Sequence, residues 1–475
     1  MKAFSAERLG RDIMKEKLRL YHTNDLHSHF ENWPKIVDYI EQKRKEHQSD
    51  GEETLVFDIG DHLDRFQFVT EATFGKANVD LLNRLHIDGA AIGNNEGITL
   101  PHEELAALYD HAEFPVIVSN LFDKNGNRPS WAVPYHIKSL KNGMSIAFLG
   151  VTVPYYPVYD KLGWTVTDAL ESIKKTNREV KGQADIIVLL SHLGILDDQA
   201  VAEAVPEIDV ILESHTHHLL EDGQVVNGVL LASAEKYGHY VGCVEITVDS
   251  VQQSIISKTA SVQNMAEWTG ESAETKAFLN EKEREAEEKL SDAVAELAQD
   301  AEVKWFEESE LPLFLAYALK EWCETDISMV NSGVILGPLK AGPVTKLDLH
   351  RICPHPINPV AVRLTGEELK ETIVHAASEQ MEQLRIKGLG FRGEVMGKMV
   401  YAGVEVETKR LDDGITHVTR ITLNGEDIKK HKQYSVAVLD MFTLGKLFPL
   451  IRDAAEKEYF MPEFLRDLLA WKLAQ

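Results

Sequence analysis

The sequence contains few cysteines, no long apolar run and no apolar leader. Cys243, Cys323 and Cys353 are widely separated, and no Cys-x-x-Cys pair occurs. A sparse and odd set of this kind indicates a reducing compartment rather than a disulfide framework. No uninterrupted run of about 18 apolar residues occurs, so we expect no membrane-spanning helix. Charged residues interrupt the N-terminal segment throughout, which excludes the apolar core of a signal peptide. We therefore predict a cytoplasmic protein.

Positive charge is also scarce. The 475 residues include 50 Lys and Arg against 76 Asp and Glu, which gives a formal net charge of −26. We therefore expect no nucleic-acid partner and no binding to an anionic membrane surface. An anionic substrate would need local positive charge, which bound metal ions could supply.

The length of the chain predicts more than one domain. From Lys17 to about residue 250, short β-rich runs alternate with amphipathic helical segments, which is typical of an α/β layered architecture. Residues 271–299 are highly charged and almost free of Gly and Pro, which predicts one long, mostly exposed helix. We interpret this helix as a linker; the alternative, a partner-binding coiled coil, lacks a sustained heptad. The expected domains are 17–255 and 301–475, joined by a linker helix at 268–300.

Five β-rich runs of the N-terminal region end in residues that can bind metal ions. In chain order the motifs are TNDLHSH with Asp25 and His27, DIGDHLD with Asp61, GNNE with Asn94, SHLG with His192, and ESHTHH with His215 and His217. Each motif alone is a weak signal, but five at the same topological end of the strands are hard to explain as solvated surface. The mixture of oxygen and nitrogen ligands suits Mn²⁺, Zn²⁺, Fe²⁺ or Co²⁺. Seven candidates are too many for one tetrahedral ion and suit two ions about 4 Å apart that share a carboxylate.

The order and spacing of these motifs resemble the calcineurin-like metallophosphoesterases, and most closely their 5′-nucleotidase/UDP-sugar hydrolase branch. The resemblance covers about residues 17–250 and implies a layered α-β-β-α sandwich of two sheets flanked by helices, with a smaller α/β C-terminal domain. It also implies two divalent ions, with Mg²⁺ as a further candidate. One ion would be held by Asp25, His27, Asp61 and His217, and the other by Asp61, Asn94, His192 and His215. A hydroxide between the ions would attack phosphorus in line.

One motif departs from the family pattern, which is Gly-Asn-His-Glu-x-Asp. In the family the histidine and the aspartate form a dyad that stabilises the transition state or protonates the leaving group. Here Asn95 stands in the place of the histidine and Ile98 in that of the aspartate. Asn95 could donate a hydrogen bond to a phosphoryl oxygen, another histidine such as His62 or His239 could substitute, or the leaving group could need no proton. We favour the first outcome together with the third, so Asn95 is the catalytic candidate.

Residues 301–475 resemble the substrate domain of the same branch, in which arginines grip phosphate and two aromatic rings sandwich the base. The similar segments are NSGVILG, PHPINPVAVRLTGEEL and YSVAVLDMFTLGKLFP. Leu336 stands at the signature arginine position and Lys398 at one aromatic position, so Phe448 is the stacking residue that matches. The candidates for holding an anionic group are Arg363, Arg392, Lys398 and Lys446, and of these Arg363 and Arg392 are favoured.

These motifs together predict a dinuclear-metal phosphohydrolase that acts on a small phosphorylated substrate, with a nucleotide favoured. A phosphodiesterase or UDP-sugar pyrophosphohydrolase and a thiosulfohydrolase-like enzyme are alternatives that use the same ions. From a different class, the chain could be a metal-stabilised nucleotide-binding module with impaired catalysis.

Overall fold

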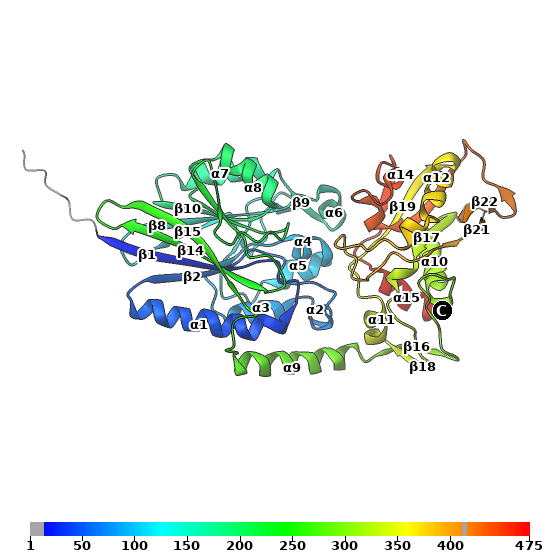
Figure 1. Cartoon of the computed structure of the whole chain (residues 1–475), viewed down its shortest axis with the longest axis horizontal. Coiled ribbons are helices and arrows are strands. Elements are labelled where there is room, and N and C mark those ends of the chain that lie inside the picture. Colours follow the sequence, from blue (N-terminus) through cyan, green and yellow to red (C-terminus); the bar gives the residue numbers. More distant parts are fainter. Residues whose placement is uncertain (1–13, 411–415) are drawn as a thin grey trace, which may run out of the picture. The chain divides into compact units, whose positions relative to one another are not determined.

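The computed structural model describes residues 14–410 and 416–475, which form two compact units (Figure 1). Unit 1 comprises the chain up to Leu63 together with residues 76–98 and 102–280. Unit 2 comprises residues 64–75, 99–101 and 281–475. Each unit has its own hydrophobic core, and the α/β class predicted from the sequence is confirmed.

Unit 1 is built on two large β-sheets. The first has the order β15-β14-β1-β2-β3-β4-β6 and the second the order β12-β13-β11-β10-β8-β7. The strands of the first sheet are β1 (Lys15–Thr23), β2 (Glu53–Asp58), β3 (Gly89–Ala90), β4 (Val116–Ile117), β6 (Ala132–Val133), β14 (Tyr240–Asp249) and β15 (Ser254–Asn264). Those of the second are β7 (Tyr135–Ser139), β8 (Ser145–Thr152), β10 (Ile186–His192), β11 (Val210–Glu213), β12 (Gln224–Val226) and β13 (Val229–Ala232). In each sheet the central strands run parallel, so their carboxyl ends share one edge.

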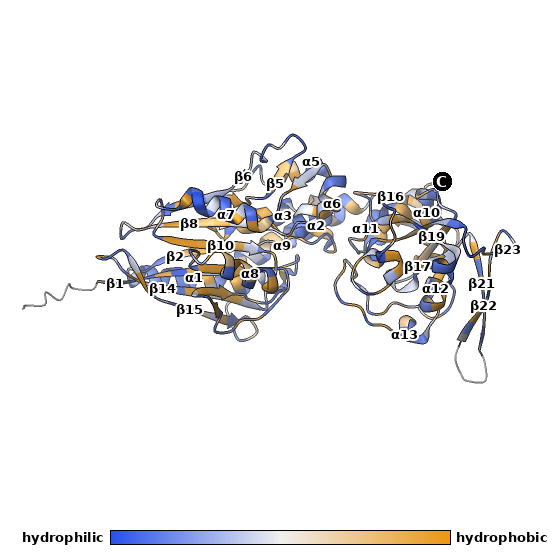
Figure 2. Cartoon of the chain, turned by 90° about the horizontal axis from the view of Figure 1, so that it is seen from above, coloured by the Kyte–Doolittle hydropathy of each residue, from blue (hydrophilic) through white to orange (hydrophobic). Residues whose placement is uncertain are grey.

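The two sheets pack face to face around a shared apolar core, and the strands show as apolar bands in Figure 2. The rings of Phe57 in β2 and Phe148 in β8 lie 4.3 Å apart across this interface. Val188 in β10 faces the same core, whereas Leu189 faces a second core beneath α7 (Ala169–Val180) and α8 (Ile195–Ala204). Burial on both faces explains why this strand is a continuous apolar run rather than an alternating one.

Helices complete the predicted α-β-β-α layering. Helix α1 (Trp33–Ser49) lies along β2 (Figure 1), and the hydroxyl of Tyr21 in β1 lies 2.9 Å from the ring of His47 in this helix. The other elements of this part are short. They are the 3-10 helix η1 (Phe30–Asn32), α3 (Lys76–Arg84), α4 (Asn94–Thr99), α5 (His102–Leu108), β5 (Leu121–Asp123), α6 (Tyr156–Lys161) and β9 (Trp164–Val166).

Two boundaries differ from those expected. The first domain was predicted to end at residue 255, which lies inside β15. This strand has weakly apolar composition because much of it is exposed, and it is recognisable only through its pairing with β14. The predicted linker helix is shorter than 268–300: α9 covers Ala273–Leu290, and β16 (Ala293–Leu297) follows and pairs with β18 (Gly342–Thr345). Tertiary pairing therefore overrides the helical propensity of the AVAEL segment.

Unit 2 contains a five-stranded sheet of order β20-β17-β24-β19-β25 and a small three-stranded sheet. The strands are β17 (Ile327–Asn331), β19 (Pro359–Thr365), β20 (Met399–Ala402), β21 (Val404–Arg410), β22 (Thr416–Leu423), β23 (Glu426–Asp427), β24 (Gln433–Leu439) and β25 (Lys457–Tyr459). The helices are α2 (Phe68–Thr73), α10 (Glu310–Trp322), η2 (Ser332–Val334), α11 (Lys346–Ile352), α12 (Gly366–Ala376), α13 (Glu379–Glu382), η3 (Asp440–Thr443), α14 (Pro449–Arg452) and α15 (Leu465–Leu473). No helix within the described residues has the length and apolarity that crossing a bilayer requires.

The Leu-Thr-Gly segment starts α12 as its sequence suggests. The hydroxyl of Thr365 accepts a hydrogen bond from the backbone N–H of Glu368, whose carboxylate accepts one from the backbone N–H of Thr365 at 2.7 Å. This reciprocal pair satisfies two backbone donors at the helix start. A side chain at Gly366 would place its Cβ 2.2 Å from the carbonyl oxygen of Lys429, so only glycine fits there.

Candidate metal centre

All five ligand motifs lie at the carboxyl ends of parallel strands of unit 1. Strands β1, β2 and β3 end just before the Asp25, Asp61 and Asn94 motifs, and β10 and β11 end at or just before His192 and His215. The carboxyl ends of parallel strands meet at one edge of each sheet, and the packing of the two sheets on a shared core brings the two edges together. The placement predicted from the sequence therefore brings the motifs to a common site.

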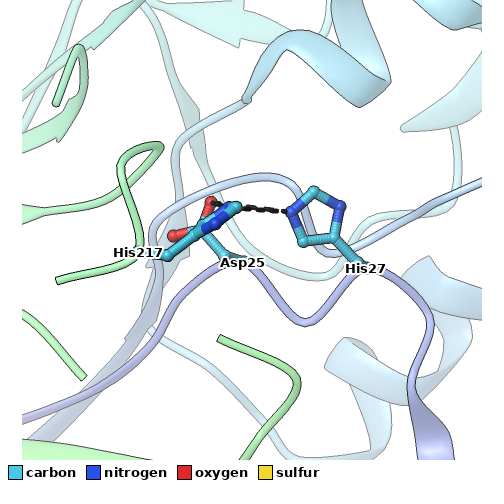
Figure 3. A group of neighbouring side chains, drawn as sticks. All are labelled: Asp25, His27 and His217. Carbon is cyan, nitrogen blue, oxygen red and sulfur yellow. Dashed lines mark hydrogen bonds and ion pairs between the residues drawn. The ribbon is translucent and has the colours of Figure 1, made fainter. Parts of the chain in front are cut away.

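Two groups of side chains are arranged as metal ligands within the described part of the chain. The first is Asp25, His27 and His217, which Figure 3 shows, and the second is Asp61, His192 and His215. In each group the candidate ligand atoms all lie within 4.8 Å of one another. In the first group, Nε2 of His27 lies 3.2 Å from Nε2 of His217 and 3.9 Å from Oδ1 of Asp25. These groups match six of the seven metal ligands predicted from the sequence.

Asp61 belongs to the second group and also faces the first. Its Oδ2 is 3.7 Å from Nε2 of His27 in the first group and 3.4 Å from Nε2 of His192 in its own. One carboxylate oxygen thus faces ligand atoms on both sides, which is the geometry of a shared ligand.

Two buried polar atoms in this region lack the partner that burial normally demands. Oδ1 of Asn94 and Nε2 of His192 make no hydrogen bond, although both atoms are inaccessible to solvent. The other ring nitrogen of His192 is satisfied by the carbonyl of Ile59 at 2.8 Å, which leaves Nε2 as the lone-pair donor. Buried polar atoms are nearly always hydrogen-bonded, so two unpaired atoms among histidines and carboxylates are suited to bind a divalent cation. Asn94, the seventh predicted ligand, therefore offers an oxygen at the site.

Five of the seven ligands have left-handed backbone conformations, which non-glycine residues rarely adopt. The residues and their φ angles are Asp25 at 50°, His27 at 49°, Asp61 at 51°, His215 at 78° and His217 at 58°. Strained backbone of this kind collects at functional sites, where the surrounding structure holds it in place.

The first aspartate is held rigidly. The Asp25 carboxylate accepts hydrogen bonds from the hydroxyl of Ser214 at 2.6 Å and from the backbone N–H of His215 at 3.1 Å. Its backbone N–H donates to the carbonyl of Gly60 at 3.1 Å, which joins the loops after β1 and β2. Ser214 was not predicted, although it directly precedes a ligand.

Glu96 of the GNNE motif fastens the loops after β2 and β3 to each other. Its buried carboxylate accepts hydrogen bonds from the backbone N–H groups of Asp61 at 3.0 Å, Leu63 at 3.2 Å and Gly93 at 2.8 Å. Burial and the neighbouring Asp61 raise the pKa of Glu96 to about 6. Glu96 therefore positions Asp61 from outside the two groups of candidate ligands.

The charge balance of the site is negative. Burial lowers the pKa values of His215 and His217 to about 4, so both rings are neutral near pH 7 and offer lone pairs. Burial also disfavours a charge on His192, yet the Asp61 and Asp25 carboxylates raise its pKa to about 10. The same carboxylate charge that raises this pKa would attract a metal cation, which would displace the proton from Nε2 and leave the lone pair for the ion.

Asn95 contacts a ligand rather than standing apart from the centre. Its carboxamide lies 2.6 Å from Nδ1 of His27, and its backbone N–H donates to Oδ1 of Asp61 at 2.7 Å. Of the two histidines considered as substitutes, His62 is buried with its Nδ1 beside Asn78 and a pKa lowered to about 3 by burial. The ring of His239 pairs with Glu235 on the surface.

The three predicted substrate-binding residues occupy different environments in unit 2. Arg363 is exposed on β19 and pairs with Glu456 at 3.0 Å. Arg392 forms an ion pair with the buried Asp64. Phe448 is only 2% exposed, and its ring packs 4.7 Å from that of Phe442. Their roles in substrate binding stay predictions.

One aromatic residue beside the centre was missed by the sequence reasoning. The hydroxyl of Tyr155 lies 3.3 Å from Nε2 of His215. It belongs to the VPYYPVY segment after β8, which carries no ligand motif and gives no signal of its own.

Comparison with known proteins gives matches over both parts of the chain. Residues 18–219 match the calcineurin-like phosphoesterase family and residues 290–448 the 5′-nucleotidase C-terminal domain. The chain is 98% identical over 462 residues to the uncharacterized metallophosphoesterase YunD of Bacillus subtilis, covering 97% of this chain and all of the relative. It is 25% identical over 432 residues to a 5′-nucleotidase of Vibrio cholerae, covering 77% and 76% of the two chains. The Haemophilus influenzae NAD nucleotidase structure has a similar fold, with a TM-score of 0.67, 16% identity, and 97% and 96% of the chains covered.

Proposed function

The chain belongs to the calcineurin-like metallophosphoesterases that carry a 5′-nucleotidase C-terminal domain, and we propose that this metal-dependent phosphoester hydrolase releases phosphate from a nucleotide. The observation that carries the proposal is the position of Asp61, whose Oδ2 faces Nε2 of His27 on one side and Nε2 of His192 on the other. This arrangement supports two ions rather than one.

Divalent ions at the two ligand groups would polarise a phosphoryl oxygen and activate water. The chain's own residues keep the ligands in place for this chemistry. Ser214 holds the Asp25 carboxylate, the backbone N–H of Asn95 holds Asp61, and the carbonyl of Ile59 holds His192 by its Nδ1–H. Ligands fixed in this way need little rearrangement during the reaction.

The nucleotide is proposed from the second unit and the relatives. The match of residues 290–448 to a 5′-nucleotidase C-terminal domain and the likeness to the Vibrio cholerae 5′-nucleotidase both favour it. We assign the anion-binding role to Arg363 and Arg392. Phe448 would stack on a base only if its ring left its present packing against Phe442.

A second candidate substrate is a pyrophosphate, as in a UDP-sugar. The observation that favours it is the absence of the acid–base dyad, since Asn95 has no proton to transfer and Ile98 is apolar. General acid–base assistance is worth about 10²–10⁴-fold, so an enzyme without it favours leaving groups that need no proton. A phosphoanhydride releases such a group.

A substrate panel tests the proposal. The full chain is stripped with a chelator, reloaded separately with Mn²⁺, Zn²⁺, Co²⁺, Fe²⁺ and Mg²⁺, and assayed with AMP, UDP-glucose, p-nitrophenyl phosphate and bis-p-nitrophenyl phosphate. We expect metal-dependent hydrolysis with highest kcat/KM on a nucleotide. Turnover of the aryl phosphate with none of the nucleotides would refute the nucleotide assignment while leaving the chemistry intact.

Asp61→Asn should reduce turnover by orders of magnitude, because it removes the shared carboxylate. The matched control is Asp249→Asn, since Asp249 is equally buried and caps the turn after β14 by accepting from the N–H of Val251 at 3.0 Å. Activity that survives both chelation and Asp61→Asn would refute the metal centre.

A further inference from the structure

We propose that Asn95 is a positioning residue that fixes the ring of His27 by its Nδ1 edge, so that Nε2 faces the metal centre. The inference deepens the proposed function and rests on it. Its basis is the 2.6 Å contact between the carboxamide of Asn95 and Nδ1 of His27. Asn95 is only 5% exposed. A contact this short in a buried place constrains the ring.

The ring of His27 has two distinct edges. Nε2 points toward the other ligands, 3.2 Å from His217, 3.7 Å from Asp61 and 3.9 Å from Asp25. Nδ1 points away from them, toward Asn95. A ring that binds a cation through Nε2 must carry its proton on Nδ1, so its neighbour there has to be an acceptor.

A carboxamide can meet this demand. Its nitrogen is the atom 2.6 Å from Nδ1. A half-turn about the last side-chain bond exchanges this nitrogen for the oxygen without changing the shape of the group. In the cation-bound form the oxygen of Asn95 then accepts the hydrogen bond from Nδ1–H of His27. The same residue thus suits either tautomer of the ring.

Asn95 also touches the shared ligand, which strengthens the assignment. Its backbone N–H donates to Oδ1 of Asp61 at 2.7 Å, while Oδ2 of the same carboxylate faces His27 and His192. One residue therefore sets the orientation of two ligands, one through its backbone and one through its side chain. The prediction that Asn95 acts on the phosphoryl group would require its carboxamide to serve the substrate instead of His27.

The test measures the affinity of the full chain for Mn²⁺ and Zn²⁺ by competition with a chromophoric chelator, without substrate. Asn95→Leu keeps the branched outline of the side chain and removes the acceptor, and we expect the dissociation constant to rise about 10–100-fold, as for other partners of metal-binding histidines. Asn95→Asp keeps an acceptor for Nδ1–H, and we expect affinity within about threefold of the parent chain, or tighter. Rescue by the acceptor variant, together with parent-like affinity in a control that puts leucine at another buried asparagine, is a result that overpacking alone would not give.

The matched control is Asn78→Leu. Asn78 is also a buried asparagine beside a histidine Nδ1, at 3.2 Å from His62, but His62 is in neither ligand group. We expect this variant to keep the affinity of the parent chain. Circular dichroism of each metal-free variant establishes that the fold is retained.

The outcomes separate the inference from the function on which it rests. Parent-like affinity in Asn95→Leu would overturn the inference, as would equal losses in Asn95→Leu and Asn95→Asp, or equal losses in Asn95→Leu and Asn78→Leu. A parent chain that binds neither ion would instead overturn the proposed function, and the inference with it. Strong metal binding by the parent chain with a selective loss in Asn95→Leu supports both.

Discussion

Gly93, the glycine of the GNNE motif, gives the sharpest prediction about the metal centre. A Cβ on Gly93 would lie 2.0 Å from Oδ1 and 2.6 Å from the backbone nitrogen of Asp61. Carbon atoms do not approach oxygen closer than 3.0 Å, so Gly93→Ala must move the shared carboxylate or its own loop by about 1 Å. The φ of Gly93 lies outside the left-handed region, so crowding and not backbone strain is the cause.

The expected size of the effect follows from this displacement. Metal sites tolerate deviations of about 0.2 Å in ligand distances, and a misplacement of about 1 Å at a reacting group costs about 10²-fold in rate. We therefore expect Gly93→Ala to lower kcat/KM for p-nitrophenyl phosphate about 100-fold or more and to weaken metal binding. Overpacking should also lower the free energy of unfolding by about 1–3 kcal/mol.

The assay compares phosphate release, chelator competition and thermal unfolding in three proteins, of which the first two are the parent chain and Gly93→Ala. The third is the control Gly337→Ala, whose Cβ would meet only a methyl of Ile352 at 3.9 Å, an ordinary contact. This control should match the parent chain in all three measurements. A folded Gly93→Ala with parent-like kcat/KM and metal affinity would refute the assignment of Asp61 as the shared ligand.

Three further predictions follow from the same structure. In Glu96→Gln, the amide oxygen can still accept from the backbone N–H groups of Asp61 and Gly93, but the amide nitrogen then faces the N–H of Leu63. Two buried donors face each other, so the free energy of unfolding in urea should fall by about 1–3 kcal/mol. Burial lowers the pKa of His355 to about 3 in the folded chain, so this side chain binds a proton more strongly in the unfolded chain. The contribution of neutral His355 to the free energy of unfolding is therefore fully present above about pH 6.5 and is lost as the pH drops toward 3. His355→Asn should therefore make urea unfolding between pH 7 and pH 5 less pH-dependent, by up to about 2 kcal/mol, and an unchanged pH dependence would contradict this account. Adding Mn²⁺ at about 100 times its dissociation constant should stabilise the chain by about 2.7 kcal/mol, and an unshifted melting temperature would count against a metal centre.

The clustering of the candidate ligands was predictable because two simple properties of the sequence coincide at them. Apolar β-rich runs mark the strands, and the residue types after each run are the ones that bind metal ions. Parallel pairing places the Asp25 and Asp61 loops at one edge of the first sheet and the His192 loop at an edge of the second. The face-to-face packing of the two sheets then brings these edges together, so the three residues meet although they are far apart in the chain. Strand pairing follows from the apolar runs, whereas the approach of the two sheets depends on the core packed between them.

Other features depend on packing and could not be read from the sequence. Strand β15 is recognised through its pairing with β14, and β16 through its pairing with β18, while both have compositions that also suit other structures. The burial of Phe448 against Phe442 is likewise a property of the folded core. The contact between Asn95 and His27 joins residues 68 positions apart, and no spacing rule connects them.

The left-handed ligands explain how the centre can be both strained and rigid. Each such non-glycine residue costs roughly 1–2 kcal/mol relative to a relaxed backbone. The strain persists because the loops bond each other: the N–H of His27 donates to the carbonyl of Asp61 at 2.8 Å, and the N–H of Tyr237 to the carbonyl of Asp25 at 2.9 Å. His27 cannot relax without breaking its bond to Asp61, and Asp25 cannot relax without breaking its bond to Tyr237. The candidate ligands are therefore arranged by the protein without a cation, so the binding energy of a metal ion would go into affinity rather than into ordering the loops.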